Sequence, residues 1–141
     1  MHKLLLAVDG SAAAHRAVQY AVALAAVVPS IEVVLLNVQP EIDDWSVLRV
    51  LTREEVEAME ESRAGDVLRE ERAVLQAAGV PFTPLVEIGA PAACITRVAA
   101  EHNCDGIVMG SRGMGAVSAA LLGSVSSEVL QSSDLPLTLI R

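Results

Sequence analysis

Short apolar runs and amphipathic segments alternate along the chain. Five apolar runs predict strands: residues 3–8, 31–38, 80–87, 106–109 and 135–140. Four segments with apolar residues at helical spacing predict helices: the stretch between Ser11 and Pro29, then 54–78, 91–102 and 124–132.

This alternation predicts an α/β fold. Because crossovers between parallel strands are right-handed, we expect a doubly wound, open parallel five-stranded sheet with helices on both faces. The expected arrangement is Rossmann-like, with strand order 3-2-1-4-5. The 141 residues match the usual size of one globular domain, and neither a linker nor a repeat divides them. We therefore expect a single domain spanning 1–141.

The longest predicted helix, 54–78, has a charged side and an apolar side. We expect its charged residues to form a solvated face, Gly65 to weaken it and Gly79 to end it. Its apolar positions are expected to point inward: Val56, Met59, Val67, Leu68, Val74, Leu75 and Ala78.

The segment before this helix, 41–53, is acidic and irregular, which predicts a connecting loop. It contains Trp45, the single tryptophan of the chain. A lone tryptophan more often packs on its own domain than contacts a partner, so we expect Trp45 to pack.

Charge and composition exclude several classes of partner. The formal net charge is −8, so nucleic-acid backbones and anionic membranes are repelled. Aromatic residues make up only 2% of the chain, which leaves few platforms for base stacking. The acidity is uneven, because residues 41–72 hold 11 acids and 5 bases and so carry a net charge of −6. The remaining chain is close to neutral and can accept an anion.

The two cysteines, Cys94 and Cys104, form neither a disulfide framework nor a CxxC metal motif. With no secretory leader recognisable, we expect a reducing, cytoplasmic compartment. No apolar stretch reaches the roughly 20 residues that a membrane span requires.

The candidate chemistry lies in the loops after the first and fourth predicted strands, where doubly wound sheets bind ligands. The first loop is Asp9-Gly10-Ser11, and the second is glycine-rich over 110–115 and closes at Gly123-Ser124. Glycines let backbone N–H groups approach a ligand closely, and a helix starting near Ser124 offers unpaired N–H groups to phosphate.

Two familiar phosphate-binding signatures are absent from the sequence. The dinucleotide fingerprint GxGxxG does not follow the first strand, and a Walker A loop needs a lysine, whereas Lys3 is the only lysine of the chain. Glycine content alone would fit a tight turn before a helix equally well.

A more specific pattern is present: Gly110-x2-Gly113-x9-Gly123-Ser124. It resembles the nucleotide-binding signature G-x2-G-x9-G-(S/T) of the universal stress protein family, in its ATP-binding subgroup. The resemblance extends to residues 5–11, 107–113 and 122–126 and covers essentially the whole chain. One departure is Ala90, where relatives often carry an acid that caps the next helix.

The resemblance implies a domain that binds ATP and Mg²⁺. Adenine would lie against Val38, and Asp9, with Val8 before it, would lie near the ribose or the metal. Ser111, Arg112 and Ser126 are weaker candidates for binding. The residues implied to hold ribose and triphosphate are Met109, Gly110, Gly113, Gly123, Ser124 and Val125.

Asp9 has two interpretations. At the end of a buried strand it can accept backbone N–H bonds in a turn, or it can bind a cation. With the complete signature present, we favour the cation. Arg112 is the only cation in the glycine-rich loop, so backbone amides, Ser124 and Mg²⁺ would supply most of the stabilisation of phosphate.

The sequence shows no candidate general base. His2, His15 and His102 are scattered and are expected at the surface, and His102 with Cys104 gives too few ligands for structural zinc. We therefore expect a regulatory domain that holds ATP and signals through conformation or assembly, with slow hydrolysis at most. The alternatives are a slow ATPase or autophosphorylating enzyme using Ser111, Ser124 or Ser126, and a dimeric stress scaffold that binds no nucleotide.

The last predicted strand, 135–140, ends the chain and should occupy an edge of the sheet. An open edge invites pairing with a second copy around a two-fold axis, although Pro136 and Arg141 can blunt it. Related stress proteins are similar in dimerising through this strand, so we expect a homodimer.

Overall fold

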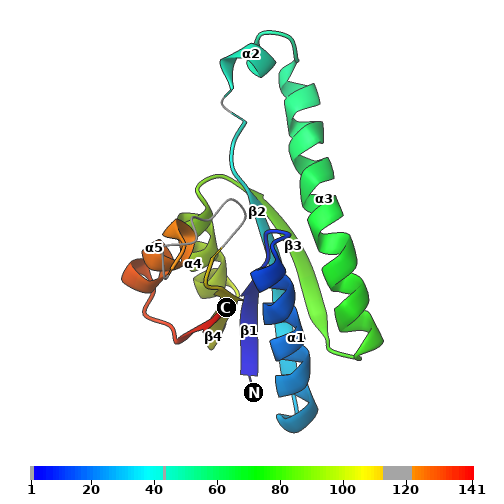
Figure 1. The fold of residues 1–141 in the computed structure, drawn as a ribbon, viewed down its shortest axis with the longest axis vertical. Coiled ribbons are helices and arrows are strands. Elements are labelled where there is room, and N and C mark those ends of the chain that lie inside the picture. The colour runs from blue at the N-terminus through cyan, green and yellow to red at the C-terminus, as the bar shows by residue number, and fades with distance from the viewer. Residues whose placement is uncertain (1, 43, 113–121) are drawn as a thin grey trace.

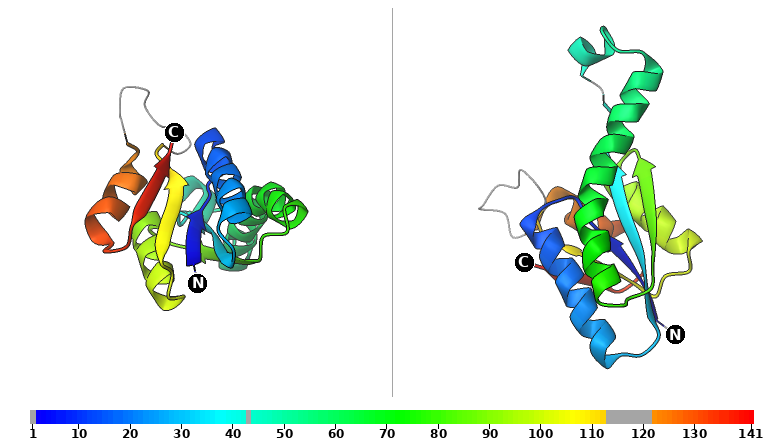
Figure 2. Two further views of the ribbon diagram at one scale, coloured as in Figure 1. Left: turned by 90° about the horizontal axis from the view of Figure 1, so that it is seen from below. Right: turned by 90° about the vertical axis from the view of Figure 1, so that its right-hand side faces the viewer.

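The computed structural model describes residues 2–42, 44–112 and 122–141. They form a parallel sheet covered by helices on both faces, as Figures 1 and 2 show. The strands are β1 (His2–Ala7), β2 (Ile31–Gln39), β3 (Phe82–Ile88), β4 (Gly106–Gly110) and β5 (Leu137–Ile140). The helices are α1 (Ala12–Val27), α2 (Trp45–Leu48), α3 (Arg53–Ala77), α4 (Pro91–Glu101) and α5 (Ser124–Ser132).

The five strands lie in the order β3-β2-β1-β4-β5, and all four pairings are parallel. This confirms the predicted doubly wound sheet and its strand order. The central strand β1 pairs with both β2 and β4, so Ala7 lies beside Leu36 on one side and Met109 on the other. The chain crosses from one half of the sheet to the other at this point, so a crevice opens between the carboxyl ends of β1 and β4.

Two apolar layers hold the helices to the sheet. One layer joins α1 and α3 to one face through residues such as Leu6, Val18 and Leu68. The other joins α4 and α5 to the opposite face through residues such as Leu5 and Val129. The left view of Figure 2 shows these helix pairs on the two sides of the sheet. Among the described helices, none is both long enough and apolar enough to span a membrane.

The helix ends follow the local sequence signals. The hydroxyl of Ser11 caps α1 by accepting from the Ala14 amide at 3.1 Å. Ala90 starts α4 without a side-chain cap, as the departure at this position predicts. Gly79, which follows α3, has φ +69°, a left-handed conformation that suits glycine and ends the helix.

Some side chains of α3 differ from the sequence prediction. Ala78 is exposed rather than inward, because it lies beyond the last helical residue as the C-cap. Two glutamates of the supposed solvated face, Glu60 and Glu71, are buried at 5% and 3% exposure. Both find polar partners inside, the backbone amide of Ile42 and the ring of His15.

The acidic connection also differs from the prediction. Residues 45–48 form the short helix α2, and the Trp45 side chain is 70% exposed instead of packed on the domain. We call residues 44–61 the arm; they comprise α2 and the first turns of α3. Figure 1 shows the arm reaching well beyond the end of the sheet, and the right view of Figure 2 shows the same projection.

Candidate functional site

A cavity of about 820 Å³ opens where β1, β2 and β4 end. Its volume lies in the range of small-molecule sites, about 300–1,000 Å³. The described residues that line it come from the ends of these strands, from the starts of α4 and α5 and from the middle of α3. The topology therefore places a cavity at the crevice where a doubly wound sheet binds its ligands.

Most of the residues singled out in the sequence meet at this cavity. Ser111 does not line it, and Gly113 lies outside the described residues. The predicted residues that line the cavity are Val8, Asp9, Val38, Met109, Gly110, Arg112, Gly123, Ser124, Val125 and Ser126.

One end of the cavity has an apolar wall. Val38 lies at the carboxyl end of β2 and Pro40 directly follows the strand, while Ile95 comes from α4 and Met109 from β4. Ile95 and Met109 belong to the core layer beneath the cavity and are buried. A flat apolar group can be desolvated between these side chains.

Another part of the wall is formed by the start of α5. Its N-cap residue is Gly123, and no side chain caps this helix start within the described chain. Helix N-termini carry unpaired N–H groups and a partial positive charge, so this end of the cavity suits phosphate. Arg112 lines the same cavity and adds a full positive charge.

Ser111 and Ser126 have structural roles at this end. The Ser111 carbonyl accepts from the Gly123 amide at 2.6 Å and from the Ser126 hydroxyl at 2.8 Å. Both serines are buried, at 4% and 2% exposure. These bonds tie the start of α5 to the end of β4, so the two sides of the glycine-rich loop are held together at one point.

Gly110 is required for packing between β4 and α1. A Cβ built on Gly110 would lie 2.8 Å from the Cβ of Ala13 and 3.0 Å from the Ala14 nitrogen. A larger residue would push away the first turn of α1, which carries Ser11 into the cavity wall.

Asp9 forms the turn that leads into this helix. Its Oδ1 accepts from the Ser11 amide at 2.9 Å, and Gly10 between them has φ +85°. The turn interpretation is thus realised, and Asp9 also lines the cavity. Within ranges 2–42, 44–112 and 122–141, no group of three or more His, Cys, Asp or Glu residues is placed to hold a metal ion.

Sequence reasoning missed several lining residues. Asn37, 1% exposed, donates from Nδ2 to the Val8 carbonyl at 2.7 Å and accepts from Gln39 Nε2 at 2.8 Å. An asparagine interrupting an otherwise apolar strand was the available signal. Arg63 and Asp66 of α3 also line the cavity, and nothing in the local sequence separates them from the other charges of that helix.

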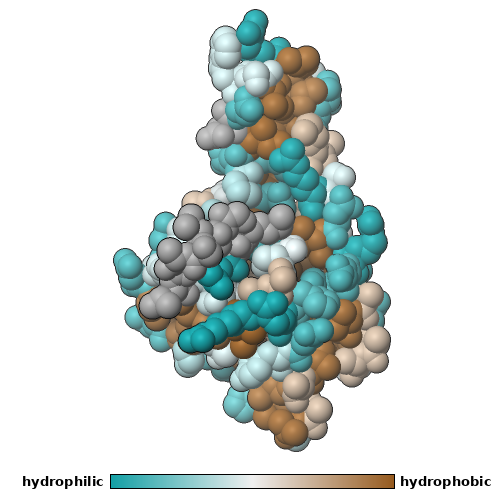
Figure 3. All heavy atoms as spheres, viewed as in Figure 1, coloured by the Kyte–Doolittle hydropathy of each residue, from teal (hydrophilic) through white to brown (hydrophobic). Residues whose placement is uncertain are grey.

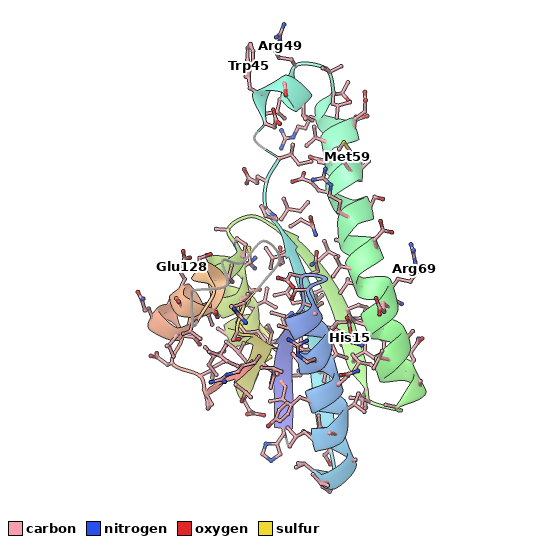
Figure 4. The ribbon with its side chains drawn as sticks, viewed as in Figure 1. His15, Trp45, Arg49, Met59, Arg69 and Glu128 are labelled. Carbon is pink, nitrogen blue, oxygen red and sulfur yellow. The ribbon has the colours of Figure 1, made fainter. Side chains whose placement is uncertain are left out.

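The histidines are not part of the cavity lining among the described residues. His15 is not a simple surface residue, since its Nδ1 lies 3.1 Å from Oε1 of Glu71, between α1 and α3 (Figure 4). The ionisable residues that do line the cavity are Asp9, Arg63, Asp66 and Arg112. The described wall therefore offers two arginines, two aspartates and backbone amides for binding, and no imidazole for proton transfer.

Comparison with known proteins identifies relatives along the full length. The model of the universal stress protein family matches residues 1–141. A Thermus aquaticus protein named "Universal stress protein in QAH/OAS sulfhydrylase 3'region" is 33% identical over 145 residues, covering 98% of this chain and 97% of that protein.

Solved structures share the fold. The universal stress protein UspA from Lactobacillus plantarum is 26% identical and superposes with a TM-score of 0.82, covering 99% of this chain and 97% of that one. A family protein from Arabidopsis thaliana with AMP bound (20% identity, TM-score 0.70, 99% and 91% coverage) and a universal stress protein in complex with cAMP (22%, 0.71, 99% and 96%) share the fold at lower identity.

Proposed function

The chain belongs to the universal stress protein family, and from this premise we propose that it binds ATP with Mg²⁺ in the cavity at the ends of β1 and β4. In this proposal the domain holds the nucleotide rather than consuming it. The bound state would be read through a change of conformation or assembly.

One observation carries the proposal. Residues from four separate parts of the chain line one cavity of nucleotide size: 8–9, 38, then 109, 110 and 112, and 123–126. Relatives with AMP or cAMP bound share this fold, which supports a nucleotide as the ligand class.

The two ends of the cavity suit the two parts of ATP. Adenine would lie in the apolar end beside Val38, Ile95 and Met109, and the triphosphate would lie along the start of α5. There the amides of Ser124 and Val125 and the guanidinium of Arg112 would bind phosphate oxygens. The Ser124 hydroxyl is exposed and can donate to the same oxygens.

Asp9 would bind Mg²⁺ together with the phosphates. Mg²⁺ usually keeps several waters and takes one or two carboxylates plus substrate phosphates, which fits a site with a single strand-end aspartate. The ion would neutralise phosphate charge that Arg112 alone leaves uncompensated.

Hydrolysis would be slow because the described wall holds no imidazole and Asp9, the carboxylate at the strand end, would be occupied by Mg²⁺. Autophosphorylation on Ser111 or Ser126 is disfavoured, since both are buried and engaged in holding the loop. We expect phosphate release far below the median enzyme turnover of about 10 s⁻¹. Release near that rate would favour the enzyme alternative.

A second copy of the chain would take part in the assembly. Strand β5 occupies the sheet edge and pairs only with β4 in the described chain. We propose that two copies pair through this edge.

The test is titration calorimetry with ATP and Mg²⁺, using Gly123→Val and, as a matched control, Gly65→Ala. A valine at Gly123 would crowd the phosphate end, so binding should fall at least about tenfold, or about 1.4 kcal/mol. Gly65 lies on α3 with no heavy atom within 4 Å of an added Cβ, so its variant should bind normally. Unchanged affinity in a folded Gly123→Val protein would refute the site.

A further inference from the structure

The tip of the arm exposes a group of large apolar side chains. Trp45, Leu48 and Val50 are 70%, 44% and 78% exposed. Figure 3 shows hydrophobic surface over this end of the molecule, and Figure 4 shows Trp45 at its extremity. Aromatic and aliphatic side chains exposed side by side, far from the core, are typical of interaction surfaces.

Local hydrogen bonds and one ring contact hold the tip. Asp44 caps α2, with Oδ1 accepting from the Ser46 amide at 2.9 Å and from the Ser46 hydroxyl at 2.6 Å. Thr52 caps α3 by accepting from the Glu55 amide at 3.2 Å. The guanidinium of Arg49 stacks over the Trp45 ring, 4.5 Å from its centre. Trp45 is thus presented to solvent by a defined scaffold.

An acidic cleft of about 400 Å³ lies between the α3 part of the arm and the residues at the ends of β2 and β3. Its single cation, Arg53, is already paired with Glu57 at 3.3 Å. Glu60 is 5% exposed and receives one hydrogen bond, from the Ile42 amide at 3.3 Å. The described residues that line the cleft, which we call the arm cleft, are Glu41, Ile42, Arg53, Val56, Glu57, Glu60, Glu61 and Ile88.

The chemistry of the arm cleft suits a long cationic side chain. Its four glutamates and one arginine give its lining a formal net charge of −3. Its apolar members, Ile42, Val56 and Ile88, can contact the alkyl part of a lysine or arginine while the carboxylates bind the charged end. No cluster of three or more His, Cys, Asp or Glu residues in the described part of the chain is arranged to hold a metal ion.

We propose that the arm is a docking surface for a basic amphipathic segment of a partner protein. The apolar side chains of that segment would pack on Trp45, Leu48 and Val50, and a lysine or arginine would enter the arm cleft. Charge argues against the other occupants: a second copy would bring another acidic arm, and the net charge of −8 repels nucleic acid and anionic membranes.

The only tryptophan of the chain is part of this surface and reports on it directly. The probes are two synthetic peptides of about 14 residues, one with lysine and leucine at helical spacing and one with glutamate in place of lysine. We expect the lysine peptide to shift Trp45 emission to shorter wavelength in a saturable way. The affinity should weaken as salt rises from about 0.05 to 0.3 M, because screening reduces the attraction. The glutamate peptide should cause no shift.

Variants of the arm test whether the peptide binds this surface or is attracted only by the overall negative charge of the protein. The double variant Leu48→Ala/Val50→Ala and the double variant Glu57→Gln/Glu61→Gln should each weaken peptide binding at least about fivefold, or about 1 kcal/mol. The matched controls, Val27→Ala/Leu130→Ala and Glu70→Gln/Glu128→Gln, change exposed residues elsewhere and should bind as the wild type does. Circular dichroism establishes that each variant is folded.

Three results would overturn the proposal. The first is an equal shift with both peptides, and the second is equal weakening in the control variants. The third is a shift without peptide that grows with protein concentration and is lost in Leu48→Ala/Val50→Ala, since a second copy would then occupy the surface.

Discussion

Glu71 is a carboxylate buried between two helices, with both of its oxygens near Nδ1 of His15, at 3.1 and 3.3 Å. Burial raises the pKa of Glu71 above its ordinary value, and this outweighs the lowering by the hydrogen bond and charge of His15. The neighbouring carboxylate of Glu70 raises the pKa further. A residue expected on a solvated face is thus a site where stability depends on pH.

We predict that Glu71→Gln removes part of the dependence of the free energy of unfolding on pH. Between the ordinary and the raised pKa, the folded protein binds more protons than the unfolded chain, so wild-type stability falls as the pH rises through that window. Within this window, the free energy of unfolding of the wild type should fall relative to that of the variant by at most about 1.4 kcal/mol per pH unit. Above the raised pKa, the difference between the two proteins should stay constant. Urea unfolding over a pH series measures this.

Because His15 contacts Glu71, the same comparison is made in a His15→Gln background, where the imidazole is absent. Glu70→Gln, an exposed neighbour, serves as the control substitution. A wild-type minus Glu71→Gln difference that stays constant or grows with pH would contradict the assignment.

Gly110 and Gly65 should respond oppositely to alanine. The added Cβ at Gly110 would meet Ala13 at 2.8 Å, so Gly110→Ala should cost about 1–3 kcal/mol and weaken ATP binding by displacing α1. At Gly65, with nothing within 4 Å and a helical backbone, alanine should add up to about 1 kcal/mol. Urea unfolding measures both, and equal effects would show that the contact with α1 relaxes freely.

Among the helices, the start of α4 is less well capped than that of α3. Ala90 offers no side-chain oxygen, whereas the Thr52 hydroxyl accepts from an amide of α3. We predict that Ala90→Ser raises the free energy of unfolding and that Thr52→Ala lowers it, each by about 0.5–2 kcal/mol. Thermal and urea unfolding test the pair, and a loss of stability in Ala90→Ser would show that its backbone cannot present the hydroxyl to the first turn.

Elements with several turns or a continuous apolar run could be predicted from sequence, and shorter ones could not. The strands and α1, α3, α4 and α5 carry enough residues to show a period or a run. The helix α2 has four residues, too few for a period, and its cap at Asp44 resembles an ordinary turn. Exposure of Trp45 depends on how far α3 projects beyond the sheet, which is a property of the assembled fold.

The part of the cavity that is formed by glycine-containing loops at the ends of strands could be predicted from the sequence. Asp9, Gly110 and Gly123 occur in recognisable loops, and the parallel topology brings these loops together. Arg63 and Asp66 line the cavity because α3 extends past the end of the sheet (Figure 1), and helical periodicity distinguishes only inward from outward positions. Contacts between segments that are distant in the sequence, such as that of His15 with Glu71, produce no pattern in the local sequence.

For the whole molecule, the proposed dimer can be tested at β5. The Pro136 carbonyl accepts from Ile107 of β4, and the Ile140 carbonyl accepts from Ser111 just after β4. Because backbone groups alternate in direction along a strand, the N–H and C=O of Leu139 face away from the sheet. We predict that Leu139→Pro, which removes that N–H, yields a monomer, whereas Leu139→Ala, which loses the same side chain and keeps the N–H, stays dimeric.

Light scattering measures this as a mass of 14.8 kDa for the proline variant against twice that value for the alanine variant and wild type. Circular dichroism controls for folding. A wild-type mass of 14.8 kDa across micromolar concentrations, with and without ATP, would rule out the dimer.

Helix α3 takes part in both proposed surfaces, since Glu57 and Glu61 line the arm cleft while Arg63 and Asp66, within the next turn and a half, line the cavity. Thermodynamic linkage then relates the two ligands: the factor by which an arm partner changes the affinity for nucleotide is the factor by which nucleotide changes the affinity for the partner. The four dissociation constants, each ligand measured with and without the other, must close a cycle. A factor of one would mean that α3 does not couple the arm cleft to the cavity.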